Sequence, residues 1–83
     1  MDPILDEVVR ACIEDRRLLE IVKNIQRMTD EERDFFERKL SFYFMNRSSE
    51  EDVQSYRFFK YVLEGDNASR ILEEVERYEG NKR

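Results

Sequence analysis

Carboxylate pairs at helical spacing are the residues of this chain whose types and positions could perform chemistry. Glu31 and Asp34 are three residues apart, and so are Glu73 and Glu76. Hard oxygen ligands of this kind hold Mg²⁺, so a magnesium-dependent nucleotide hydrolase is one hypothesis. Both pairs project away from the apolar faces of their helices, and the helix dipole alone favours acids in a first turn. In a chain with 20 acidic residues such pairs also arise by chance, so we expect no metal site.

Other catalytic chemistry lacks its usual residues. The chain has no histidine, the usual base for a serine or cysteine nucleophile and a common ligand of zinc and di-iron centres. Its single cysteine, Cys12, lies among valine and isoleucine, where burial raises a thiol pKa and suppresses reactivity. Gly65 and Gly80 stand alone and form no phosphate-binding loop. We therefore predict a protein without enzymatic activity, cofactor or small-molecule ligand.

A basic stripe could bind nucleic acid. Arg16, Lys23 and Arg27 align on one side of a helix predicted over residues 16–28, opposite its apolar face. Phosphate contacts need such a stripe. A solvated face, with Glu20 paired to Arg16 and Lys23, fits the sequence better, and an acidic protein partner fits as well as DNA. Because a net charge of −5 repels a polyanion at long range, nucleic-acid binding is the second hypothesis, with two stripes combined in a dimer.

Aromatic residues are concentrated in the middle of the chain. Of four tyrosines and six phenylalanines, nine lie between residues 35 and 61. On the helices predicted there they occupy two faces. The second face is formed by Phe35, Phe42, Phe58 and Tyr61. An uncovered aromatic strip is typical of a partner-binding surface, so we predict that these four residues bind a partner. A core that covers every aromatic face is the alternative.

Composition indicates one small domain. The chain has 83 residues, of which 42% are charged. A lone cysteine cannot form an internal disulfide, which favours a cytoplasmic location. No run of 18 apolar residues is present, so we expect no membrane span. Many charges with few glycines and prolines are typical of thermophilic proteins, although a helical protein with a well-solvated surface has the same composition.

Hydrophobic periodicity predicts five helices. They span residues 3–14, 16–28, 30–46, 49–64 and 67–79, and a frayed tail follows over residues 80–83. The apolar face changes direction near Asp15, where we predict a break, with one bent helix over residues 3–28 as the alternative. Gly65 and Gly80 are predicted to end the fourth and fifth helices, because glycine favours the left-handed position after a helix.

Capping signals support the predicted helix starts. Asp2, followed by a proline at the first helical position, is typical of the beginning of a helix. Thr29–Glu32 and Ser48–Glu51 have the spacing of capping boxes, and Asp66 or Asn67 would begin the last helix. The loops between the helices are short, which places successive helices side by side.

The segment 53–63 is apolar nearly all round, which is typical of a buried helix. No stretch shows the alternation of a strand. We therefore predict an all-α fold, a compact bundle of four to five short helices around a central aromatic helical hairpin over residues 35–61. The function that fits best is a small protein–protein interaction module, acting as a homo-oligomer, most simply a dimer, or as a small subunit of a larger assembly.

Overall fold

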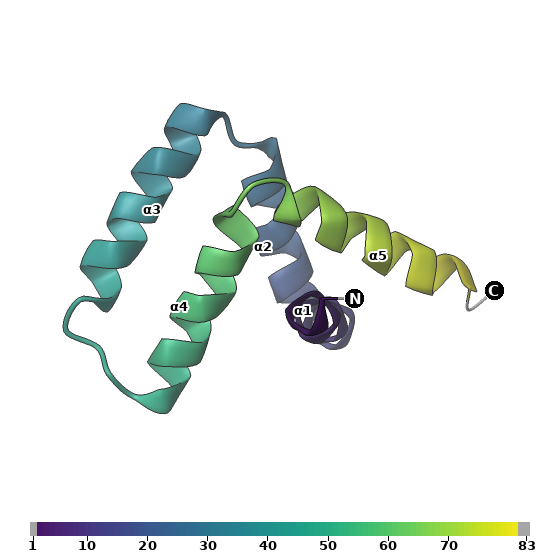
Figure 1. Ribbon diagram of the computed structural model, residues 1–83, viewed down its shortest axis with the longest axis horizontal. Coiled ribbons are helices and arrows are strands. Elements are labelled where there is room, and N and C mark those ends of the chain that lie inside the picture. The colour runs from purple at the N-terminus through teal and green to yellow at the C-terminus, as the bar shows by residue number, and fades with distance from the viewer. Residues whose placement is uncertain (1, 82–83) are drawn as a thin grey trace.

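The computed structural model describes residues 2–81 as five α-helices (Figure 1). The helices are α1 (Pro3–Glu14), α2 (Arg16–Arg27), α3 (Asp30–Phe44), α4 (Glu50–Leu63) and α5 (Asn67–Asn81). No strand occurs in this described range. The prediction of an all-α bundle is confirmed.

Two aspartates determine where the first two helices begin. The Asp2 carboxylate accepts a hydrogen bond from the Ile4 backbone N–H at 3.0 Å, with Pro3 at the first helical position. The Asp15 carboxylate accepts from the Arg17 backbone N–H at 3.0 Å and from the Arg17 guanidinium at 2.9 Å. Because Asp15 is extended, with φ −129° and ψ 104°, α1 and α2 are separate helices and not one bent helix.

The two helices of the α3–α4 hairpin also begin at capping residues. Thr29 Oγ1 accepts from the Glu32 backbone N–H at 3.2 Å, and the Glu32 carboxylate accepts from the Thr29 backbone N–H at 2.9 Å. This is the predicted capping box. The start of α4 lies one residue later than predicted, because Ser49, not Ser48, is the cap and accepts from the Asp52 backbone N–H at 3.1 Å.

The two glycines differ in role. Gly65 has a left-handed φ of +49° immediately after α4, as predicted. Asn67 closes this turn by donating its side-chain amide to the Tyr61 carbonyl at 2.8 Å. Gly80 lies inside α5, which continues to Asn81, so the prediction that Gly80 ends the helix is wrong. Of the predicted tail, residues 82–83 lie outside the described range.

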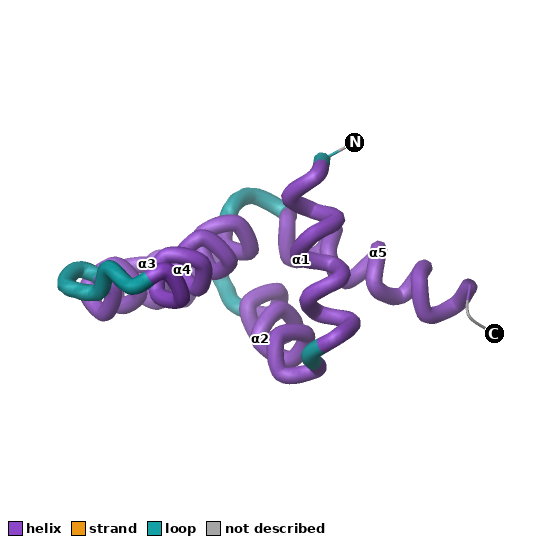
Figure 2. Tube along the Cα trace, turned by 90° about the horizontal axis from the view of Figure 1, so that it is seen from below, coloured by secondary structure: helices purple, strands orange, loops and turns teal. Residues whose placement is uncertain are grey.

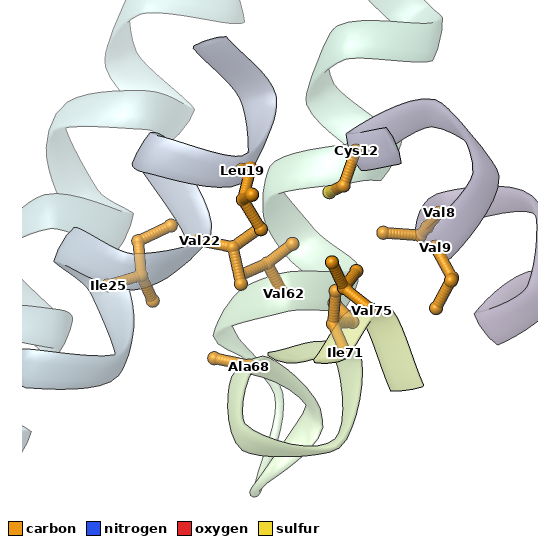
Figure 3. Packing of buried hydrophobic residues seen from close by; sticks show 10 residues of the cluster. All are labelled: Val8, Val9, Cys12, Leu19, Val22, Ile25, Val62, Ala68, Ile71 and Val75. Atoms are coloured by element: carbon orange, nitrogen blue, oxygen red, sulfur yellow. The ribbon is translucent and has the colours of Figure 1, made fainter. Parts of the chain in front are cut away.

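The core lies among α1, α2 and α5, which we call the three-helix core. Its buried side chains are short and aliphatic, and α4 adds one residue near its C-terminal end (Figure 3). The buried set is Val8, Val9, Cys12, Leu19, Val22, Ile25, Val62, Ala68, Ile71 and Val75. Three helices can approach closely only where their side chains are small enough to interdigitate at high packing density.

The α3–α4 hairpin is therefore not at the centre of the bundle, as the sequence suggested. It projects from one side of the three-helix core, and the C-terminal end of α5 reaches out on the opposite side (Figures 1 and 2). Apart from Val62, the buried residue of the hairpin is Leu40. None of the nine aromatic residues of the hairpin is fully buried, because six are half-buried and Phe35, Phe42 and Tyr43 are exposed.

The two hairpin helices meet along one aromatic face each. The Phe36 and Phe59 rings lie 5.9 Å apart edge to face, and the Phe44 and Tyr56 rings lie 5.4 Å apart. Lys60 Nζ is 2.9 Å from the Glu37 carboxylate across the same seam. These contacts hold α3 to α4 and fix which side of α3 faces outward. Within residues 2–81, no helix has both the length and the apolar character needed to cross a bilayer.

Candidate partner-binding surface

The outward side of α3 carries two of the four aromatic residues predicted to bind a partner. Phe35 is 60% exposed and Phe42 is 78% exposed. They are seven residues apart, two helical turns, and lie opposite the side on which Phe36 and Leu40 pack toward α4. Because α3 packs against a neighbour on one side only, one of its two apolar faces is covered and the face with Phe35 and Phe42 is exposed to solvent.

The other two predicted residues, Phe58 and Tyr61, lie elsewhere. Both pack against the buried core. Tyr61 Oη donates a hydrogen bond to the Asp2 carboxylate at 2.7 Å, which ties α4 to the start of α1. Burial, followed by the Asp2 hydrogen bond, raises the pKa of Tyr61 to about 12. The predicted four-residue strip is thus not one surface, because the α4 half of it packs against the core.

Further exposed residues of α3 extend the surface. Tyr43 is 56% exposed, and Met45, just after the helix, is 68% exposed. Lys39 Nζ lies 4.7 Å from the centre of the Phe35 ring, and the Arg47 guanidinium lies 4.3 Å from that of Tyr43. Lys39 follows Phe35 by four positions within α3, so the helical period could have predicted this contact. Arg47 lies beyond the end of α3, so the helical period does not predict its contact with Tyr43.

We define the α3 outer surface by the exposed residues of this side. They are Glu31, Glu32, Phe35, Arg38, Lys39, Phe42, Tyr43 and Met45. Charge is divided along it. Four exposed acids, Asp30, Glu31, Glu32 and Asp34, occupy the first half of α3, whereas residues 38–49 contain three cations and no acid. The surface is therefore apolar along its length, acidic at one end and basic at the other.

The predicted basic stripe of α2 is largely paired with carboxylates. Arg16 Nη1 is 2.6 Å from the Glu79 carboxylate of α5, and Lys23 Nζ is 3.6 Å from that of Glu20. Arg27 is exposed in the last turn of α2. Because two of the three cations already have acidic neighbours, the stripe presents less positive charge than the sequence alone suggests.

The residues considered for chemistry are dispersed. Glu31 and Asp34 lie on α3, and Glu73 and Glu76 lie on α5. Over residues 2–81 no three acidic or cysteine side chains gather closely enough to hold a metal ion. Cys12 has no exposed surface, and burial raises the pKa of its thiol to about 11, with a smaller contribution from the Asp15 charge.

Comparisons with protein-family models, with curated proteins and with solved structures find no match to this chain.

Proposed function

We propose that this chain is a small, non-enzymatic protein–protein interaction module of the cytoplasm. It binds through the α3 outer surface, either as a homo-oligomer or as a small subunit of a larger assembly. The observation that supports this proposal is the exposure of Phe35 and Phe42 on the side of α3 that faces away from α4.

Leaving these rings in water is costly. Apolar area removed from water contributes about 25 cal/mol per Å², and a phenyl ring offers well over 100 Å². The two rings lie on one regular helix and Lys39 lies over the Phe35 ring, as in interfaces that combine aromatic anchors with a polar rim. A partner that covers them gains this free energy without any rearrangement of the core.

Two variants of matched chemistry test the proposal. Phe42→Glu places a charge on an exposed position and is expected to abolish partner binding while leaving the melting temperature within a few degrees of wild type. Phe58→Glu places the same charge on a side chain packed against the core and is expected to destabilise the fold itself. Light scattering and thermal denaturation measure the two effects.

Two results together would overturn the proposal. The first is a wild-type chain that is monomeric at high micromolar concentration, and the second is the absence of any host protein that binds wild type but not Phe42→Glu. Equal loss of folding in both variants would instead place Phe42 in the core. Nucleic-acid binding is the competing function. Mobility of labelled DNA and RNA at two salt concentrations tests it, because phosphate binding weakens steeply with salt.

A further inference from the structure

We propose that the partner of the α3 outer surface is a second copy of this chain, docked with its α3 antiparallel to the first about a two-fold axis at Phe35. This inference rests on the proposed function and specifies its partner. It is carried by the division of charge along a single exposed helix face.

The two ends of the surface are complementary to each other. Glu31 and Glu32 lie in the first turn of α3, and Arg38 and Lys39 lie two turns later on the same exposed side. When two copies run antiparallel, the acidic end of each meets the basic end of the other. The positive end of each helix dipole then also lies beside the negative end of the other. Parallel copies would bring acids to acids and cations to cations, which repel.

Helical geometry then selects the register. With 3.6 residues per turn, Glu31 and Arg38 lie on one flank of the Phe35–Phe42 line, and Glu32 and Lys39 lie on the other. A two-fold axis at Phe35 places Arg38 opposite Glu31 of the second copy, and Lys39 opposite its Glu32. Each pair then differs in height by about 1.5 Å, the rise of one residue. The two Phe35 rings meet at the axis.

A second antiparallel register would place Phe35 opposite Phe42 of the other copy. Its axis falls between Arg38 and Lys39, so each of these cations would lie beside its own counterpart. Like charges at this distance oppose association. The register centred on Phe35 is the one in which apolar contact and charge pairing agree.

A charge-reversal cycle tests the pairing. Glu31→Arg and Arg38→Glu each create two like-charge contacts per dimer, so each should weaken dimerisation about tenfold or more. The double variant E31R/R38E restores opposite charges and should recover most of the affinity. The matched control is Glu51→Arg, an exposed acid at the second position of α4, which should leave the affinity unchanged. Analytical ultracentrifugation gives the dissociation constants.

Disulfide trapping tests the register. In Phe35→Cys the two new thiols meet at the axis and should form an intermolecular disulfide under mild oxidation. In Phe42→Cys they lie about 20 Å apart, fourteen residue rises, and should not. The buried native thiol of Cys12 does not compete. Trapping through both positions would indicate parallel helices, and trapping through neither would indicate another register.

Each adverse result has a defined meaning. Absence of rescue in the double variant, or trapping through both positions, overturns the antiparallel arrangement, and trapping through neither position overturns the register centred on Phe35. A monomeric wild-type chain overturns self-association as a whole. The proposed function survives that last result only if a different protein binds wild type and fails to bind Phe42→Glu, so the two failures are distinguishable.

Discussion

Cys12 has the chemistry of a reactive residue and the environment of an inert one. Its side chain is fully buried among Val8, Val9 and the residues of α2 and α5. Burial raises its pKa to about 11, so the reactive thiolate is scarce near neutral pH. We expect Ellman's reagent to label Cys12 slowly in the native protein and at once in denaturant. Rapid native labelling would show that α1 opens readily or does not pack as described.

The Tyr61–Asp2 hydrogen bond should make stability depend on pH. The bond lowers the pKa of Asp2 below its ordinary value of 3.8. The stability that the ionised Asp2 carboxylate contributes is therefore present above pH 3.8 and is lost as pH falls below it. Burial, and after it this bond, raises the pKa of Tyr61 from 10.0 to about 12, so the stability gained from the protonated hydroxyl is present below pH 10 and is lost as pH rises toward 12.

Tyr61→Phe should therefore lower the free energy of unfolding by about 1 kcal/mol at neutral pH, the usual value of one hydrogen bond. The difference from wild type should shrink in acid, below the ordinary pKa of Asp2. Urea denaturation at several pH values measures it, with Tyr43→Phe, an exposed tyrosine, as the control. A difference that is constant with pH would mean that the hydroxyl does not bond to Asp2.

At the scale of elements, the two glycines allow a matched test of helix ends. Gly65 has φ +49° and open space around it, so Gly65→Ala should cost about 1 kcal/mol through backbone strain alone. Gly80 lies in α5, also with open space, so Gly80→Ala should stabilise by about 0.5 kcal/mol, less than at a helix centre. Thermal denaturation compares them. Stabilisation by both changes would contradict the left-handed turn at Gly65.

The helices themselves could be predicted because their signals are local. The Thr29–Glu32 box and the Asp15 cap act within one turn, and both are formed. The signal at Gly80 is ambiguous, because a glycine after a helix and a glycine inside its last turn give the same sequence pattern. At Ser48 and Ser49, two adjacent cap residues offered two starts, and the hydrogen bond to Asp52 decided for the second.

Which apolar faces meet could not be predicted in the same way. Phe35, Phe42, Phe58 and Tyr61 are equivalent in periodicity, yet the first two are exposed and the last two pack against the core. Their difference depends on which side of the hairpin the three-helix core packs against, and the helical period of the hairpin does not give that side. A helix that is apolar on all sides can lie at the centre of a bundle or between two neighbouring parts of the fold. The helix α4 is of the second kind, because it lies between α3 and the three-helix core.

At the scale of the whole molecule, the fold has two parts of unequal packing. The three-helix core contains nearly all fully buried side chains, whereas α3 contributes Leu40 alone. The hairpin is attached to this core through Val62 of α4, through Phe58 and Phe59 packed against the buried cluster, and through the Tyr61–Asp2 hydrogen bond. Arg33 Nη1 of α3 donates to the Gly65 carbonyl, in the turn after α4, at 3.1 Å. The helix that presents the proposed interface is therefore also the least supported helix.

This inequality predicts how the molecule opens. Local opening requires little energy where few apolar contacts are buried, so α3 amides should exchange with solvent faster than those of α2 and α5 at low micromolar concentration. Self-association through the α3 outer surface would protect α3 at near-millimolar concentration and leave the core unchanged. Phe42→Glu should remove this concentration dependence. Residue-resolved hydrogen exchange measures α2, α3 and α5 in one experiment. Uniform protection at low concentration would mean that α3 opens only when the whole chain unfolds.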